Sequence, residues 1–153
     1  MNKRHTRVLA SGVFDLVHYG HIYFLKEAKR AGGRSAYLIV VVARDKTVEL
    51  LKGKQPVLPE EQRRAIVESL KPVNKAVLGD EIFNMEETLK RIKPDIIAMG
   101  YDQTKIEATV RKLIAEKHLE IEVVRIGKST YSGLESSSRI KMKIVGKMRG
   151  KYL

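Results

Sequence analysis

Residues 12–21 of the chain read GVFDLVHYGH and join two segments of different character. The short apolar run 8–10 before them predicts a strand, and residues 20–31 at their end predict a helix. Gly12 favours a close turn, while His18 and His21 fall where the helix begins. A helix N-terminus has unpaired N–H groups and the positive end of the helix dipole, so this turn predicts an anion site.

The alternation of strand and helix continues to the C-terminus. The nearly unbroken apolar run 37–43, YLIVVVA, is typical of a strand buried on both faces in a parallel sheet. We therefore predict an α/β fold, a five-stranded parallel sheet with helices on both faces, formed as one domain over residues 1–153. Further strands are predicted at 76–78, 96–99 and 121–126, a helical turn at 45–51, and helices at 59–70, 85–92, 104–117 and 136–148.

Composition restricts the class of protein. The 153 residues are 43% hydrophobic and 31% charged, which is typical of a globular protein with a substantial core. There is no cysteine, and no apolar run approaches the ~20 residues of a membrane span, so we expect a cytoplasmic protein without membrane contact. The net charge of +12 favours anionic partners such as nucleotides, phosphorylated substrates or nucleic acid. Part of the charge lies in a C-terminal segment that also fits a solvated helix face, with Lys141, Lys143, Lys147, Arg149 and Lys151.

Three polar segments follow predicted strands, at residues 12–21, 100–103 and 127–138. In open α/β sheets ligands bind beyond the carboxyl ends of the strands, so we expect these segments to converge there. No G-x-G-x-x-G or Walker sequence is present, which disfavours those two modes of nucleotide binding.

Two motifs carry the chemistry, and each also has a simpler interpretation. His18 and His21 are three residues apart and share one side of a helical turn; each alone is also typical of a cap or a packed side chain. No third residue has the spacing of a zinc site, and we expect no metal ligands from the protein. The last predicted helix begins with three serines, Ser136, Ser137 and Ser138, although a single serine is enough for an N-cap.

The segment GVFDLVHYGH resembles the G-x-F-D-x-x-H-x-G-H signature of the cytidylyltransferase-like nucleotidyltransferases, and the serine cluster resembles their second signature. The stretches ARDKTVELLKGKQPVLPEEQRRAIVESLKPVNKAVLGD and MGYDQ are most similar to archaeal FAD synthases. This resemblance covers nearly the whole chain and implies the Rossmann-like HxGH fold. It also implies transfer of AMP from ATP to FMN, which gives FAD and pyrophosphate. The chain departs from the pattern at Val13, where the family usually has threonine.

The resemblance also implies roles for individual residues. His18 and His21 are expected to be catalytic, as donors to the charge that develops on pyrophosphate. Asp15, Lys46, Lys52 and Arg63 are expected to bind the acceptor; Asp15 is equally consistent with a turn former or a residue near a cation, and each lysine with a surface residue. Residues expected to bind ATP, the two histidines included, are Gly12, Val13, Phe14, His18, Tyr19, Gly20, His21, Gly100, Asp102, Tyr131, Ser136, Ser137 and Ser138.

A phosphate monoester has its second pKa near ~6, so the acceptor is ionised at neutral pH and needs no strong general base. We expect Mg²⁺ to accompany ATP without dedicated protein ligands. By resemblance, a homodimer is also possible. Two alternatives stay open: a CTP-dependent enzyme such as a glycerol-3-phosphate cytidylyltransferase, and a non-catalytic nucleic-acid-binding module suggested by the charge. No aromatic-rich RNA-binding signature supports the second alternative, and we expect no specific nucleic acid.

Overall fold

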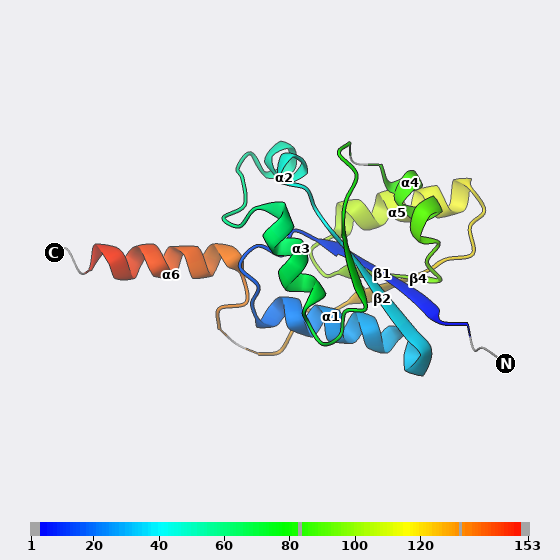
Figure 1. The fold of residues 1–153 in the computed structure, drawn as a ribbon, viewed down its shortest axis with the longest axis horizontal. Helices are drawn as coiled ribbons and strands as arrows, with labels where there is room; N and C mark the ends of the chain where they lie inside the picture. The colour runs from blue at the N-terminus through cyan, green and yellow to red at the C-terminus, as the bar shows by residue number, and fades with distance from the viewer. Residues whose placement is uncertain (1–3, 83, 132, 151–153) are drawn as a thin grey trace.

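The fold is a five-stranded, all-parallel sheet with the strand order β3-β2-β1-β4-β5. The computed structural model describes residues 4–82, 84–131 and 133–150, so Lys151 of the basic segment lies outside the described residues. Strand order reverses beside β1, which pairs with both β2 and β4. Figure 1 shows α1 on one side of the sheet and α4 and α5 on the other. The predicted five-stranded α/β sheet is thus confirmed.

The predicted elements all occur, with shifts of one or two residues at most ends. The helical turn expected at 45–51 is a regular helix that ends at Gly53, whose φ of 70° is the left-handed cap that glycine favours. The strands are β1 Thr6–Gly12, β2 Ala36–Val42, β3 Lys75–Leu78, β4 Ile96–Gly100 and β5 Glu122–Ile126. The helices are α1 Tyr19–Ala31, α2 Asp45–Lys52, α3 Glu60–Glu68, α4 Met85–Ile92, α5 Thr104–Glu116 and α6 Ser137–Arg149, with a 3-10 turn η1 at Gly33–Ser35.

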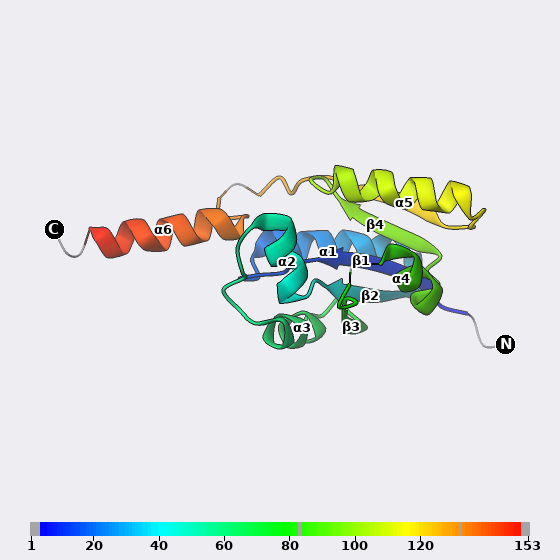
Figure 2. The same ribbon diagram turned by 90° about the horizontal axis from the view of Figure 1, so that it is seen from above.

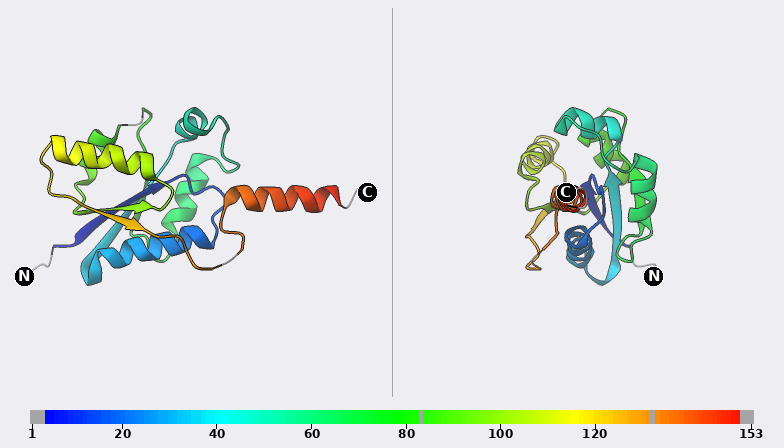
Figure 3. Two further views of the ribbon diagram at one scale, coloured as in Figure 1. Left: turned by 180° about the vertical axis from the view of Figure 1, so that it is seen from behind. Right: turned by 90° about the vertical axis from the view of Figure 1, so that its left-hand side faces the viewer.

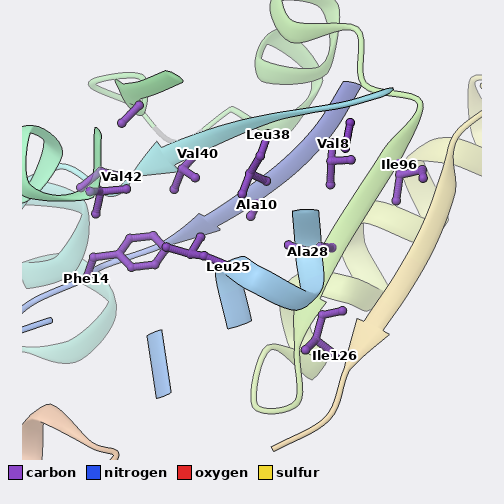
Figure 4. Packing of buried hydrophobic residues seen from close by; sticks show 14 residues of the cluster. Val8, Ala10, Phe14, Leu25, Ala28, Leu38, Val40, Val42, Ile96 and Ile126 are labelled. Atoms are coloured by element: carbon purple, nitrogen blue, oxygen red, sulfur yellow. The ribbon is translucent and has the colours of Figure 1, made fainter. Parts of the chain in front are cut away.

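Alternation along the strands divides the core into two layers. On one face Val8, Val40 and Ile96 point toward Leu25 and Ala28 of α1 (Figure 4). On the opposite face Leu9, Ile39, Val41, Ile97 and Met99 pack against Leu89 and Ile92 of α4 and Val110 of α5. Because both faces are covered, the central strands are continuous apolar runs, as the sequence 37–43 predicts.

The last helix, α6, is placed differently from the others. It leaves the domain at the carboxyl ends of the strands and extends away from the sheet, as Figures 2 and 3 show from two further directions. None of its described residues is buried, and Met142, Ile144, Val145 and Met148 are exposed. Within the described residues no helix is long and apolar enough to cross a membrane.

Candidate functional site

The turn between β1 and α1 has an unusual backbone. Phe14 and Leu16 adopt φ values of 55° and 50°, in the left-handed region that non-glycine residues rarely adopt. Each such residue costs about 1–3 kcal/mol, so surrounding interactions must hold the turn in this form. Gly12 allows the Phe14 ring to pack closely, because a Cβ there would lie 3.0 Å from the ring, which would have to shift by a few tenths of an ångström.

Asp15, between the two strained residues, connects the turn to two distant segments. Its carboxylate accepts hydrogen bonds from the N–H groups of Val57 (2.9 Å) and Leu58 (3.0 Å), and Lys141 of α6 donates to it at 2.9 Å. Burial opposes ionisation of Asp15, but these hydrogen bonds outweigh it and lower the pKa of the carboxyl. Both carboxylate oxygens are thus already used, which argues for a role in positioning over contact with an acceptor or a cation.

Arg63 also stabilises this turn. Its guanidinium is fully buried and donates to the carbonyl oxygens of Val13 (2.6 Å) and Leu58 (2.9 Å) and to the carboxylate of Asp45 (2.6 Å). Asp45 begins α2, so Arg63 joins the turn to both α2 and α3. The structure therefore places Arg63 beneath the site with its donors engaged, and not at the surface where an acceptor would bind.

The two histidines form a reciprocal cap at the start of α1. The N–H of Gly20 donates to Nδ1 of His18 (3.1 Å), and the N–H of His18 donates to Nδ1 of His21 (3.2 Å). The rings are stacked with centroids 3.8 Å apart. Since each Nδ1 accepts a hydrogen bond, each neutral ring carries its proton on Nε2. The stacked rings of His18 and His21 therefore carry two Nε2–H donors side by side at the N-terminus of α1.

Both histidines are held in the neutral form. Burial lowers the pKa of His18, against the opposing charge of Glu135. Burial, the neighbouring His18 and the charge of Lys52 lower the pKa of His21 to about 4, with Asp15 acting in the opposite direction. An anion bound beside the rings would favour their charged form and raise these pKa values.

The start of α6 lies against this turn, although it is more than a hundred residues away in sequence. The hydroxyl of Ser137 donates to the carbonyl oxygen of Asp15, and a Cβ on Gly20 would lie 3.2 Å from the carbonyl oxygen of Glu135. Ser136 is the N-cap of α6, but its side chain makes no capping hydrogen bond, and Ser138 is exposed. Two helix N-termini, those of α1 and α6, are therefore adjacent.

The end of β4 joins the site through a residue that the sequence analysis does not select. Gln103 accepts a hydrogen bond from the N–H of Gly100 (2.7 Å) and donates to the carbonyl oxygen of Ser11 (3.0 Å). This side chain connects the end of β4 to the end of β1. Asp102 is exposed and lies close to Gly100, where a Cβ would be 3.1 Å from its carboxylate.

The structure brings only some of the remaining predicted residues close to the histidines. Tyr19 and Tyr131 form an exposed aromatic pair with ring centroids 4.8 Å apart. Lys46 and Lys52 are both exposed on α2, and Lys52 lies close enough to His21 for its charge to affect that pKa. Within the residues that the structure describes, no group of three or more His, Asp or Glu side chains is placed to hold a metal ion.

Lys141 is the other positioning residue that the sequence analysis misses. It follows Ser137 by one helical turn, and both side chains contact Asp15. The i, i+4 spacing from the serine cluster would have placed it on the same side of α6. Its partner could not be known, because 126 residues separate Lys141 from Asp15.

Comparison with known proteins identifies the family of this chain. A family described as cytidylyltransferase-like matches residues 9–143. The chain belongs to this family. It is 45% identical to an FAD synthase of Ferroglobus placidus over 91% of this chain and 88% of the relative, and 44% identical to one of Aciduliprofundum boonei over 95% of both. A crystal structure from Thermoplasma volcanium, described as a lipopolysaccharide core biosynthesis protein, is 45% identical with a TM-score of 0.73, covering 80% of this chain and 97% of that one.

The low pKa of His21 leads to a prediction about pH. The unfolded chain takes up this proton near pH ~6.5, whereas the folded protein does so only at about 4. The contribution of His21 to the free energy of unfolding is therefore fully present above pH ~6.5 and decreases as the pH falls towards 4. Imidazole NMR titration should give a pKa of about 4 for His21 in the free protein, and urea denaturation should show less pH dependence in His21→Asn. A His21 pKa near ~6.5 would contradict the neutral, desolvated ring.

Proposed function

We propose that this protein transfers AMP from ATP to FMN, which gives FAD and pyrophosphate. The observation that carries the proposal is the pair of Nε2–H donors at the start of α1, next to the serine-bearing start of α6. Such a pair of helix N-termini suits a chain of phosphates. The FAD synthases of Ferroglobus placidus and Aciduliprofundum boonei, similar along nearly their whole length, support FAD as the product. Their coverage also supports a single domain as the unit of activity.

The proposed reaction is an in-line displacement. A phosphate oxygen of FMN forms a bond to the α-phosphorus of ATP, and the bond from that phosphorus to the oxygen bridging to the β-phosphate breaks. Pyrophosphate leaves with the bonding electron pair. The FMN phosphate is ionised at neutral pH, so no proton has to be removed from it. His18 and His21 donate from Nε2 to the oxygens on which charge develops. Ser136 and Ser138 hold the outer phosphates together with backbone N–H groups at the start of α6, where the hydroxyl of Ser137 already donates to Asp15.

The other residues divide between contact and positioning. The backbone of Gly12, Val13 and Phe14 approaches the phosphates, and Tyr19, Tyr131, Gly100 and Asp102 lie around the nucleoside. Lys46 and Lys52 neutralise the charge of the acceptor, whereas Asp15 and Arg63 position the turn. Mg²⁺ would be held by the triphosphate itself, which fits a site whose buried carboxylate, Asp15, is already paired. We propose the cytoplasm as the location of this reaction, with ATP and FMN as its substrates.

A substrate panel tests the activity. We expect pyrophosphate release with ATP and FMN together in the presence of Mg²⁺, with FAD as the second product, measured by coupled phosphate detection and by chromatography of the flavin. Release with CTP and glycerol 3-phosphate, and none with ATP and FMN, would overturn the proposal in favour of a cytidylyltransferase. Salt-sensitive RNA binding with no release from any pair would overturn it in favour of a nucleic-acid-binding module.

The histidines provide a separate test of the mechanism. Replacement of either one by alanine removes a donor that acts in the transition state, so kcat should fall by about 100-fold or more, while KM for ATP changes little. Steady-state kinetics of His18→Ala and His21→Ala measure both constants. His118→Ala, at a histidine outside the site, is the matched control and should keep the activity of the unmodified protein. Near-normal turnover in both site variants would contradict a role in the transition state.

We also infer that the protein forms a homodimer through α6. Ile144, Val145 and Met148 lie on one side of this helix and remain 46–56% exposed. Lys143 and Lys147 lie on the other side. An exposed apolar stripe on a projecting helix is typical of an interface, and a second copy of α6 can cover it with two-fold symmetry while the lysines stay in solvent.

Sedimentation velocity tests this inference. The unmodified protein should sediment as a dimer, and a double variant, Ile144→Gln with Met148→Gln, should sediment as a monomer with unchanged circular dichroism of the domain. Lys143→Gln is the matched control on the opposite side of the same helix and should remain dimeric. A monomeric unmodified protein, or a dimer that the double variant does not weaken, would contradict this interface.

A further inference from the structure

A cavity with basic residues in its lining lies at the end of the sheet opposite to the two histidines. This cavity of about 310 Å³ is lined by residues of β1, β2, β3 and α4, among them Arg7, Tyr37, Lys75 and Arg91. Arg7 is five residues before Gly12 on β1, so the cavity and the proposed catalytic turn are roughly 17 Å apart at about 3.3 Å per residue. It lies near the amino ends of the strands, whereas the histidines lie beyond their carboxyl ends.

The register of the strands explains how this cavity arises. Arg7 pairs with Tyr37 and Ile39 pairs with Lys75, so these four side chains lie on the same face of the sheet. That face is covered by α4 and α5 over the central strands, while α3 contacts β3 from the opposite face. The floor formed by β2 and β3 therefore stays open, and Ile92 of α4 forms one wall.

The polar lining is strongly cationic. Arg7, Lys75 and Arg91 carry three positive charges, and Lys75 has no ion pair among the residues that the structure describes. Arg91 donates to Asp80 at 2.8 Å, and the guanidinium of Arg7 donates to the carbonyl oxygen of Ile92 at 2.9 Å. No carboxylate lines the cavity itself. Asp80 pairs with Arg91, and Glu68 lies near enough to Lys75 for the two charges to interact, while the side chain of Arg7 has no ion pair among the described residues. The lining as a whole therefore favours an anion.

The apolar and aromatic lining suits a flat ring. The rings of His5 and Tyr37 are 5.9 Å apart at the rim, and the floor is formed by Ile39 and Val77. A hydrogen-bonding contact joins Nδ1 of His5 to the carbonyl oxygen of Ser35 at 3.3 Å, so the ring is oriented at the rim. The cavity volume is at the lower end of the range of about 300–1,000 Å³ for ligand pockets, which suits a mononucleotide.

We propose that this cavity is a second ligand site, which binds an aromatic phosphate monoester of mononucleotide size. The ring lies against Tyr37 and the apolar floor, and the phosphate lies between Lys75 and Arg91. Because the cavity and the catalytic turn are at opposite ends of β1, such a ligand does not displace ATP or the acceptor. The proposal does not depend on the reaction catalysed at the other end of the sheet.

Imidazole NMR separates the two sites in one experiment. The chain has four histidines: His5 reports on the cavity, His18 and His21 report on the catalytic turn, and His118 serves as a reference outside both. AMP, adenosine and inorganic phosphate are each titrated into the full-length protein. We expect AMP to shift the His5 signals in a saturable manner and to bind at His5 at least ~10-fold more tightly than adenosine or phosphate alone, since each lacks one half of the contacts.

Variants then test the assignment of the contacts. Lys75→Gln and Tyr37→Leu should each weaken AMP binding at His5 by about 10-fold and leave the shifts of His18 and His21 unchanged. Lys143→Gln, on α6, is the matched control and should have no effect. The proposal is overturned if AMP leaves His5 unshifted at millimolar concentration, if phosphate binds as tightly as AMP, or if neither cavity variant weakens binding. Shifts of His5 that follow protein concentration and not AMP would also overturn it, because they would indicate an interface between copies.

Discussion

The strained turn between β1 and α1, held by Arg63 and Asp15, is the constraint on which the rest of the site depends. Phe14 and Leu16 adopt left-handed backbone conformations that cost energy, and the buried guanidinium of Arg63 and the carboxylate of Asp15 compensate for them. The same two side chains connect the turn to α2, α3 and α6. One local conformation thereby brings Lys52 of α2 and the serine-bearing start of α6 close to the histidines of α1.

Support of the turn and contact with a ligand fall to different residues of the site. Asp15 and Arg63 use their hydrogen-bonding groups on the protein itself, whereas His18 and His21 use only Nδ1 and leave Nε2 available. A charged residue with all its partners in the protein serves as a support, whereas a capped imidazole keeps one donor free for a ligand. Burial, which lowers the pKa of both histidines, suits rings that donate a hydrogen bond and do not remove a proton.

Much of the fold was predictable because local signals were strong. The apolar run 37–43 indicated a strand buried on both faces. The predicted limits of α3 and α4 also have local causes, since Pro59 and two acidic residues stand at the start of α3 and Pro94 closely follows α4. The regular helix at Asp45–Lys52 was underestimated, since its stabilising contacts, such as that of Asp45 with Arg63, come from a distant segment. Gln103 and Lys141 were missed for the same reason: their partners are 92 and 126 residues away.

The sequence by itself determined the parallel α/β fold and the residues of both signatures, and it predicted an anion site at the turn, because these follow from periodicity and short spacings. Only the tertiary structure decided what each charged side chain does. Asp15 and Arg63 have the residue types of ligand-binding groups, but their burial and hydrogen bonds make them supports. The tertiary structure also created the cavity at Arg7 and Lys75, since strand register and helix placement, which depend on contacts distant in sequence, bring those cations together.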